Sequence, residues 1–201
     1  MPALTRPDPL PRNFYARATI EVARDLLGCL LVRELSNGVL LAGRIVETEC
    51  YDGPQDTACH GARGCTPRTR ALFGPPGHAY VYLVYGMHDL FNVVTDRADY
   101  PAGVLIRAVE PVMGLETMQY LRPVPENRLA NGPGKLTRAL AIDRTHDGLD
   151  LTTGAGLWLA RAGAPTGRQI ICGPRIGIDY AEESDRLAPW RFRLLPPVKG
   201  G

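Results

Sequence analysis

The sequence predicts an α+β fold of one domain, in which a mostly antiparallel, curved β-sheet carries flanking helices and a protruding β-hairpin. Two observations support this class. Runs rich in β-branched and aromatic residues are separated by short turn signals, of which Ser36-Asn37-Gly38 is the clearest. Strand-like and helix-like segments also follow one another without βαβ alternation, and no internal repeat is visible. The length of 201 residues suits one domain with a sizeable core.

The first half of the chain is expected to contain one helix and four strands. Residues 1–13 are rich in proline and polar side chains, so we expect residues 1–16 to form a flexible arm ahead of a domain at 17–201. Thr19 is a suitable N-cap for a helix that ends at Gly28 and buries Ile20, Ala23, Leu26 and Leu27. Strands are predicted at 29–35, 39–51, 79–85 and 90–95, with an irregular loop at 52–77.

The second half continues with helices and strands of similar length. A strand is predicted at 103–109, and Pro111 is expected to open a helix that runs to Leu121. The glycine-rich stretch 129–136 is expected to lead into a helix that ends near Ile142. The remaining strands are predicted at 157–161, 169–178 and 190–195, the middle one broken by Gly173-Pro174.

The composition is that of an ordinary globular protein, with 45% hydrophobic residues. No apolar run approaches the roughly 20 residues of a membrane span, and the N-terminus lacks the apolar core of a secretory signal. We therefore expect no membrane partner and a cytoplasmic location, or a nuclear one in a eukaryote.

Five cysteines form an odd set without a C-x-x-C pair, so we expect no disulfide framework. The spacings of Cys50, Cys59, His60 and Cys65 do not match those of a zinc site. We expect neither a metal ion nor a cofactor.

The net charge of +2 indicates no particular partner, but its distribution does. No Asp or Glu occurs from Thr57 to His88, whereas this stretch contains several basic side chains: His60, Arg63, Arg68, Arg70, His78 and His88. Such a segment can meet phosphate groups. A loop that merely lacks acids is the alternative interpretation.

The stretch V-E-T-E-C-Y at residues 46–51 has an unusual pattern. Because side chains alternate along a strand, Glu47, Glu49 and Tyr51 share one face. A carboxylate beside a ring can act as a general base, or it can stabilise a cationic, sugar-like transition state. Alternatively, a glutamate pairs with an arginine, for instance Arg44 or Arg107, and we expect one of the two glutamates to do so.

Aromatic residues form a second pattern around the predicted hairpin. Tyr80 and Tyr82 share a face, and Tyr80 is equally well explained as an ordinary strand residue. Tyr85 falls at the hairpin tip, where it has little core to pack against and could fill the gap left by a base that leaves a DNA stack. Tyr51 and Tyr82 together could hold a flat, electron-poor ligand, with a cation–π attraction of roughly 0.5–2 kcal/mol.

Other motifs narrow the choice of function. The stretch N-G-P-G-K-L-T lacks the spacing of a Walker loop, but Lys135 at the start of a helix can still grip one backbone phosphate. The sequence contains no G-x-S-x-G, H-E-x-x-H or strand-linked G-x-G-x-x-G. Common hydrolase, zinc-protease and dinucleotide-binding functions therefore lack support.

Five motifs taken together resemble the alkyladenine DNA glycosylase family, the mammalian-type 3-methyladenine DNA glycosylases. They are V-E-T-E-C-Y-D-G-P-x-D-x-A-x-H, T-P-R-x-R, Y-V-Y-x-x-Y-G-M-x-x-x-x-N, L-I-R-A-V-E-P-x-x-G-L-E-T-M and N-G-P-G-K-L-T-x-A-L-A-I. The resemblance runs in order from about residue 17 to residue 195. It implies an enzyme that cuts the N-glycosidic bond of alkylated or deaminated purines flipped out of double-stranded DNA, without a cofactor. A monomer suits such an enzyme.

The resemblance also implies roles for individual residues. Glu49 matches the general base that activates water, and Arg107 matches an arginine near that water. Tyr51 and Tyr82 match the rings that sandwich the flipped base, and His60 matches a histidine in the same pocket.

Further matches concern base selection and DNA contact. Asn92 matches the asparagine that disfavours normal guanine by crowding its exocyclic amine. Tyr85 matches the tyrosine that wedges into the duplex from the minor groove. The expected DNA-contacting residues are Tyr85, Met87, Thr66, Arg68 and Lys135.

The chain departs from the mammalian pattern in three respects. It has no long N-terminal extension, the segment 121–131 is short, and Cys50 and Cys59 stand where many relatives carry small residues. These differences bear on the range of lesions and the grip on DNA more than on the chemistry.

Two functions of other classes stay open at this point. Removal of Met1 would expose the secondary amine of Pro2, which can form an imine with an opened deoxyribose, so a bifunctional glycosylase/lyase is the first. A non-catalytic module that binds nucleic acid through residues 57–88 is the second. It accounts for phosphate binding but not for an acid beside the rings.

Overall fold

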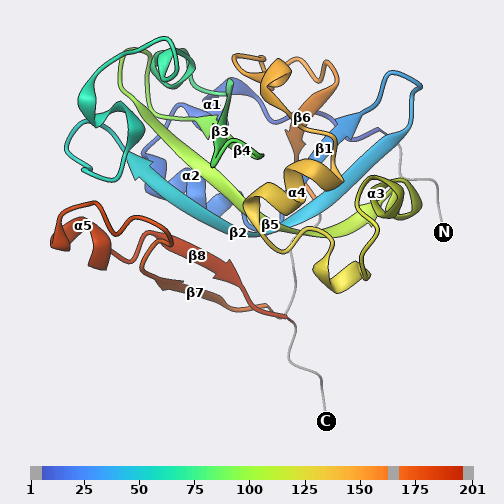
Figure 1. The fold of residues 1–201 in the computed structure, drawn as a ribbon. Coiled ribbons are helices and arrows are strands. Elements are labelled where there is room, and N and C mark those ends of the chain that lie inside the picture. The colour runs from blue at the N-terminus through green and yellow to red at the C-terminus, as the bar shows by residue number, and fades with distance from the viewer. Residues whose placement is uncertain (1–5, 163–167, 197–201) are drawn as a thin grey trace.

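The computed structural model describes residues 6–162 and 168–196. One curved antiparallel sheet dominates the fold, in the strand order β3-β4-β5-β2-β1-β6, with β8 pairing to β2 and β7 to β8 (Figure 1). This confirms the predicted α+β class. The strands are β1 Leu30–Glu34, β2 Leu40–Asp52, β3 Ala79–Val84, β4 His88–Val94, β5 Ala102–Met113, β6 Leu157–Ala160, β7 Ile170–Gly173 and β8 Arg191–Leu194.

Short helices flank the sheet and close its main core. Helices α2 and α4 pack against β2, β4 and β5, over a cluster that includes Leu31, Ile45, Phe91, Ile106 and Leu136. The α-helices are α1 Arg12–Tyr15, α2 Thr19–Asp25, α3 Leu115–Leu121, α4 Pro133–Ala139 and α5 Glu183–Leu187. The 3₁₀ helices are η1 His60–Arg63, η2 Arg70–Phe73, η3 Glu126–Arg128 and η4 Arg144–His146.

The two longest strands, β2 and β5, give the sheet its bend. Their pairing shifts register between Ala42 and Gly43 and again on either side of Glu47. A β-bulge, in which one strand has an extra residue opposite its partner, bends that strand and increases its twist. Beyond the second irregularity the ladder is regular, so that Glu49 pairs with Leu105 and Tyr51 with Gly103. The end of β2 that carries Glu49 and Tyr51 therefore has a defined register.

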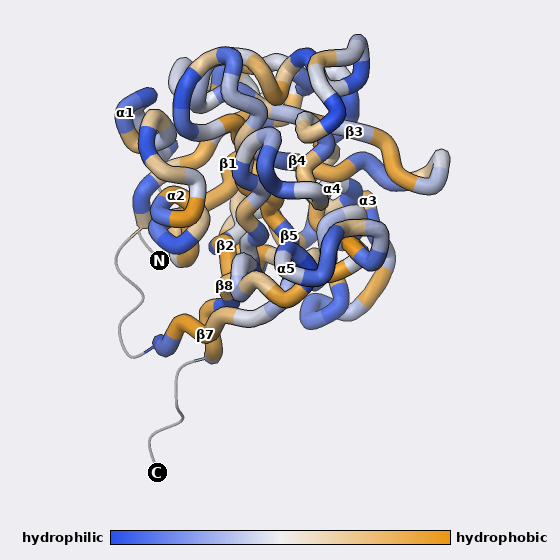
Figure 2. The backbone as a smooth tube through the Cα atoms, turned by 90° about the vertical axis from the view of Figure 1, so that its left-hand side faces the viewer, coloured by the Kyte–Doolittle hydropathy of each residue, from blue (hydrophilic) through white to orange (hydrophobic). Residues whose placement is uncertain are grey.

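The hairpin of β3 and β4 extends from the body of the molecule (Figure 2). Its register runs from Ala79 opposite Val93 to Val84 opposite His88, which confirms the predicted second hairpin. The tip contains two consecutive residues of positive φ, Tyr85 at 52° and Gly86 at 69°. Positive φ is strained for a residue with a bulky side chain, so the conformation of Tyr85 is unfavourable in free energy.

The predicted arm at residues 1–16 is packed where the structure describes it. Leu10, Phe14 and Tyr15 are buried in the main core, and Pro9 forms a backbone bridge to Ala160 of β6. Burial of these apolar side chains outweighs the prolines around them. The first five residues, with Pro2 and its predicted amine chemistry, lie outside the described part of the chain.

Two helix starts differ from their predictions. Thr19 does not cap α2. The N-cap is Ala18, and the buried Thr19 hydroxyl donates to Asp52 Oδ1 at 3.0 Å. Pro111 does not open a helix either, because β5 continues to Met113 and α3 begins only after Gly114, whose φ is 76°. Thr19 has a side-chain partner in β2 and Pro111 pairs in register with Gly43 of β2, and a local pattern reveals neither contact.

Two strand predictions also change. Residues 36–38 form the predicted turn between β1 and β2, but only Gly38 has positive φ (80°). The connection is therefore a three-residue loop, in which Gly38 N–H donates to the backbone oxygen of Leu35. The predicted strand at 169–178 ends at Gly173, and residues 174–178 are irregular.

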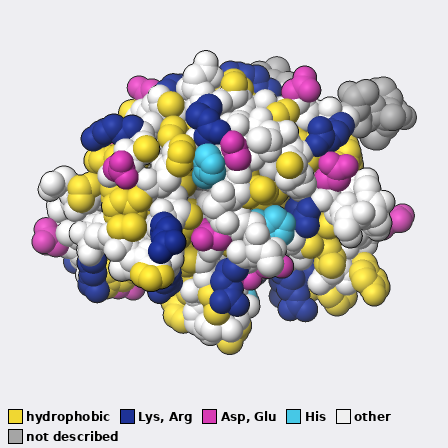
Figure 3. Space-filling model, turned by 90° about the horizontal axis from the view of Figure 1, so that it is seen from above, with side chains coloured by type: hydrophobic (Ala, Val, Ile, Leu, Met, Phe, Trp, Pro, Cys, Tyr) yellow, Lys and Arg dark blue, Asp and Glu magenta, His cyan; other side chains and the backbone are white. Residues whose placement is uncertain are grey.

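The surface mixes charges of both signs. Seen from above, Lys and Arg side chains are spread among Asp, Glu and hydrophobic side chains (Figure 3). Among the described residues, no helix has the length and apolar character needed to cross a membrane.

Candidate active site

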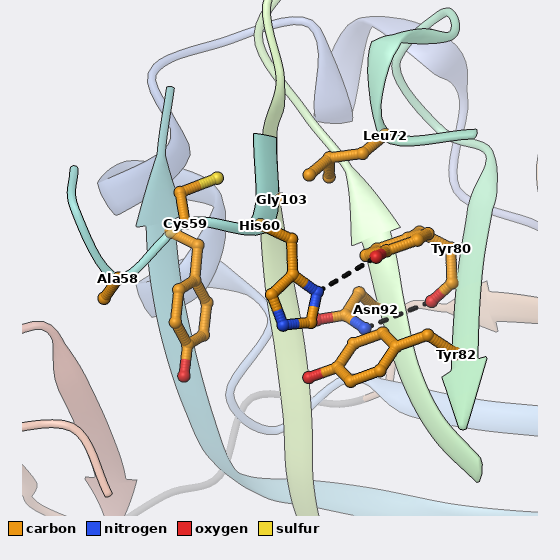
Figure 4. Close-up of a pocket in the computed structure, with 9 residues that line it drawn as sticks. Ala58, Cys59, His60, Leu72, Tyr80, Tyr82, Asn92 and Gly103 are labelled. Carbon is orange, nitrogen blue, oxygen red and sulfur yellow. Dashed lines mark hydrogen bonds between the residues drawn. The ribbon is translucent and has the colours of Figure 1, made fainter. Parts of the chain in front are cut away.

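A pocket opens between the end of β2 and the strands of the hairpin, with a volume of about 280 Å³ including its mouth (Figure 4). The lining residues come from β2, β3, β4, β5 and the loop between β2 and β3: Tyr51, Ala58, Cys59, His60, Leu72, Tyr80, Tyr82, Asn92 and Gly103. Four predicted site residues, Tyr51, His60, Tyr82 and Asn92, therefore line one pocket.

Three rings form one wall of the pocket. The His60 and Tyr82 rings have centroids 4.4 Å apart, and the Tyr80 and Tyr82 rings 5.2 Å apart. The Tyr80 hydroxyl lies 3.0 Å from His60 Nδ1 (Figure 4). Tyr80 is thus both a buried strand residue and a support for the histidine.

His60 is neutral at physiological pH in this setting. Burial, helped by the nearby charge of Arg68, lowers the pKa of His60 to about 4. A charged imidazolium would repel a cationic ligand, whereas the neutral ring does not. The pocket can therefore accept a positively charged flat molecule.

Asn92 is held in a fixed orientation on β4. Its Nδ2 donates to the backbone oxygen of Tyr80 at 3.1 Å, and the residue is 5% exposed. A polar group locked in this way can reject a ligand group placed against it, because the amide cannot turn aside without leaving a buried donor unpaired.

Glu49 lies behind Tyr51 and is fully buried. Its Oε2 accepts from the Tyr51 hydroxyl at 2.9 Å and from Arg107 at 3.1 Å, and its Oε1 accepts from the backbone N–H of Ile176 at 2.8 Å. Burial raises the pKa of Glu49, and the charge of Arg107 together with these hydrogen bonds opposes the rise. The carboxylate is thus made more basic than usual yet kept in place.

Arg107 connects the two glutamates of β2. Its Nε donates to Glu47 Oε1 at 3.2 Å while its terminal nitrogen reaches Glu49. Glu47 also lies 3.4 Å from Arg191. The expected ion pair with Arg107 is therefore present, and it involves both glutamates and not one of them as predicted. Arg44, the other suggested partner, instead donates to the backbone oxygen of Gly28.

Two predicted DNA-contacting residues occupy the hairpin tip. Tyr85 is 87% exposed and Met87 is 71% exposed. Large apolar side chains that are exposed together indicate a contact surface.

The other three predicted DNA-contacting residues are exposed around this hairpin. Arg68 stacks over the Tyr82 ring at 5.6 Å and donates to the backbone oxygen of Leu83. Lys135 is on α4. This helix packs against β4, near His88, the first residue of that strand. Thr66 lies in the loop before Arg68, and its hydroxyl is 3.0 Å from that of Thr69.

The sequence patterns did not identify the residues behind the pocket. Arg175 is buried, pairs with Asp56 and stacks on Tyr51, and Tyr180 donates to the backbone oxygen of Ala58. Arg175 and Asp56 are 119 positions apart in the chain, and no local periodicity links them. The only sequence feature that could have pointed to Arg175 is the charge of an arginine inside the predicted strand 169–178.

The cysteines are free, with Cys29, Cys50 and Cys59 buried and the other two exposed. Within residues 6–162 and 168–196, no three His, Cys, Asp or Glu side chains are grouped as metal ligands.

Comparison with known proteins identifies relatives along nearly the whole chain. The family model described as methylpurine-DNA glycosylase matches residues 13–196. A protein of Methanocella arvoryzae, provisionally named a 3-methyladenine DNA glycosylase, is 52% identical over 185 residues, which is 91% of this chain and 90% of the relative. A protein of Carboxydothermus hydrogenoformans with the same provisional name is 50% identical over 186 residues, 92% of this chain and 94% of the relative.

Proposed function

The chain belongs to the methylpurine-DNA glycosylase family, a family of hydrolases that act on N-glycosyl bonds, and from this premise we propose that it excises damaged purines from double-stranded DNA with water activated by Glu49. The family makes the chain a DNA glycosylase of base-excision repair.

One observation carries this proposal: a fully buried carboxylate is hydrogen-bonded to the hydroxyl of a ring that lines a flat, aromatic pocket. A carboxylate has about four lone-pair sites, and three are occupied by Tyr51, Arg107 and Ile176. The remaining site can accept a proton from a water molecule. Arg107 keeps the acid oriented and charged.

The chemistry requires a single displacement. The oxygen of water bonds to C1′ of the deoxyribose as the bond from C1′ to the purine nitrogen breaks. The electron pair of that bond leaves with the purine, and the proton of the water passes to Glu49. The negative charge of Glu49 also stabilises the cationic character of the sugar in the transition state. The products are the free base and an abasic site.

The pocket suits alkylated purines because of its rings and its charge. Tyr51 and Tyr82 offer ring faces to a base, and a cationic base gains roughly 0.5–2 kcal/mol from them. The neutral state of His60 adds no opposing charge. We propose 3-methyladenine as a substrate, with 7-methylguanine, hypoxanthine and ethenoadenine as further candidates, and we assign the exclusion of guanine to Asn92.

DNA binding is assigned to the hairpin and the residues around it. Flipping a base costs a few kcal/mol, and least for a damaged, weakly paired base. Tyr85 and Met87 at the tip would fill the space that the base leaves, while Thr66, Arg68 and Lys135 would bind backbone phosphates.

The deciding experiment compares Glu49→Gln with Glu47→Gln. General-base catalysis contributes about 10²–10⁴-fold, so Glu49→Gln should lower single-turnover release of hypoxanthine from a duplex by that factor while duplex binding persists. Glu47 shares Arg107 but has no hydrogen bond to Tyr51, so Glu47→Gln should keep most of the activity. Parental release by Glu49→Gln would rule Glu49 out as the base.

We further propose that the enzyme is monofunctional. Borohydride treatment during the reaction should then trap no protein–DNA adduct, whereas an imine formed by an amine would be reduced to a stable link. A panel of duplexes that each carry one lesion would establish the substrate range.

A further inference from the structure

The Tyr51 ring is supported on one face by a buried arginine. The guanidinium carbon of Arg175 lies 4.8 Å from the centroid of Tyr51 and 4.9 Å from that of Trp190. The Arg175 side chain has no exposed surface. A planar cation between two rings restricts both. Tyr51 is the ring that lines the pocket and whose hydroxyl donates to Glu49.

Asp56 holds the arginine from the loop that enters the pocket. Its two oxygens accept from Arg175 at 2.5 and 2.8 Å, a bidentate pair without exposed surface. The same carboxylate accepts from the backbone N–H of Asp52 at 3.1 Å and from that of Ala58 at 3.0 Å. Asp56 thus ties the arginine to the end of β2 and to the segment that leads to His60.

The residue that follows Arg175 contacts Glu49, the proposed general base. The backbone N–H of Ile176 donates to Glu49 Oε1 at 2.8 Å. Two consecutive residues of the segment after β7 therefore reach two neighbouring functional groups, the ring of Tyr51 and the carboxylate of Glu49. Displacement of Arg175 would move both contacts together.

Stability alone does not explain a buried ion pair, because the cost of removing two charges from water offsets most of the attraction. Resting on the function proposed above, we propose that Arg175, held by Asp56, is a positioning residue that sets the ring plane of Tyr51 and delivers the Ile176 N–H to Glu49. No pattern in the sequence and no comparison assigns this role.

The proposal has a consequence for the pH dependence of the reaction. The hydrogen bonds from Ile176 and Tyr51 both lower the pKa of Glu49, against the effect of burial. If they loosen, the pKa of Glu49 rises further. Because the base acts only when it is deprotonated, the fall in rate at low pH should then begin at a higher pH.

Arg175→Lys is the first test. Lysine keeps the charge beside Asp56 but lacks the planar fork and the stacking surface. Misplacement of reacting groups by about 1 Å can cost roughly 100-fold, so we expect single-turnover release of hypoxanthine to fall about 10- to 100-fold. The acid side of the pH–rate profile should move to higher pH, while affinity for an abasic-site duplex stays unchanged.

A second variant tests the same role without leaving an unpaired buried charge that could unfold the protein. Asp56→Asn with Arg175→Met removes both charges, so no charge is left buried without a partner, and the asparagine oxygen can still accept from Ala58. It should show the same slower release and shifted profile. Arg12→Lys is the matched control, because Arg12 on α1 forms a 2.5 Å pair with Asp150 away from the pocket. It should leave rate and profile unchanged.

Two results would overturn this inference. Parental rate and pH profile in Arg175→Lys or in the double variant would show that the pair does not position the site. Failure of both variants to fold would show that its role is structural only. Glu49→Gln separates this result from the wider proposal: if it abolishes release while Arg175→Lys changes nothing, only the positioning role fails.

Discussion

At the scale of single residues, a buried carboxylate, Glu49, lies near a half-buried neutral imidazole, His60. Burial disfavours the charged form of each, so it raises the pKa of Glu49 and lowers that of His60. The positive charge of Arg107 offsets the cost of burying the Glu49 carboxylate, as do three hydrogen bonds, from Tyr51, Ile176 and Arg107 itself. The Tyr80 hydroxyl beside His60 suits the neutral ring. We therefore expect different roles for the two residues: a charged carboxylate behind Tyr51 and a neutral imidazole in the pocket wall.

The lowered pKa of His60 predicts a loss of stability in mild acid. Unfolded histidine takes up a proton near pH 6.5, but folded His60 does so only near pH 4. Between these values the unfolded state binds more protons, so stability falls as the pH decreases from 6.5 to 4. Each pKa unit corresponds to about 1.4 kcal/mol, which limits the loss to about 3 kcal/mol.

Urea unfolding of the parent and of His60→Gln measures this effect. The variant has no imidazole to titrate, so it should lose less stability than the parent between pH 6.5 and pH 4. Between pH 7.5 and pH 9 the two proteins should differ by a constant amount. If the unfolding free energies of parent and variant fell equally between pH 6.5 and pH 4, the pKa of His60 would not be lowered by folding.

The residue patterns of the sequence predicted part of the site. The alternation of a strand predicted that Glu49 and Tyr51 share a face, and the hydrogen bond between them bears this out. Arg175 was not predicted, since Tyr51 and Asp56, the partners that connect it to the site, lie more than 100 positions away. Contacts of this kind depend on how β7 and β8 fold back on β2, and a local period does not contain that information.

At the scale of elements, the hairpin between β3 and β4 stores strain at its tip. Tyr85 has φ of 52°, a conformation that costs most residues about 1–2 kcal/mol but suits asparagine better. Tyr85→Asn should therefore stabilise the fold by up to about 1 kcal/mol. It should also slow base release, because the large ring that would enter the duplex is lost.

A matched control separates strain from function. Ala141 has φ of 50° just after α4, away from the pocket. Ala141→Asn should stabilise the protein by a similar amount without changing base release. Thermal unfolding and single-turnover assays on both variants measure the two effects, and an unchanged release rate in Tyr85→Asn would remove Tyr85 from the DNA-contacting set.

The elements themselves were predicted better than their ends. Every strand expected from the sequence has a counterpart in the sheet, because β-rich runs and turn residues mark strands clearly. Helices α1 and α5 were missed, since their 4 and 5 residues are too short to show a helical period. Residues 9–15 of the proline-rich start pack against the body, and a local pattern cannot predict this because the packing depends on contact with distant β6.

At the scale of the whole molecule, we expect binding to DNA to depend on the distribution of charge more than on the net charge. The formal charge is only +2, and the face in Figure 3 mixes both signs. We therefore expect a broad attraction to DNA to be weak, and we expect the basic residues near the hairpin to supply the phosphate contacts. The segment from Thr57 to His88, which has no acidic residue, forms much of that region.

Salt dependence measures these contacts directly. For duplex DNA, the slope of log K against log salt concentration is about −0.9 for each phosphate neutralised. Lys135→Gln removes one candidate contact, so its slope should be shallower than the parental slope by about 0.9, with equal loss of affinity for damaged and undamaged duplexes. The loss should be equal because a phosphate contact carries no information on the base.

Arg97→Gln provides the matched control for this measurement. Arg97 is 68% exposed and pairs with Asp96, just beyond the end of β4 that is far from the hairpin tip. Removing it changes the net charge as much as Lys135→Gln does. If net charge governed binding, both variants would flatten the slope equally. We expect only Lys135→Gln to do so, because counterions are released where a side chain meets a phosphate and not by the charge of the molecule as a whole.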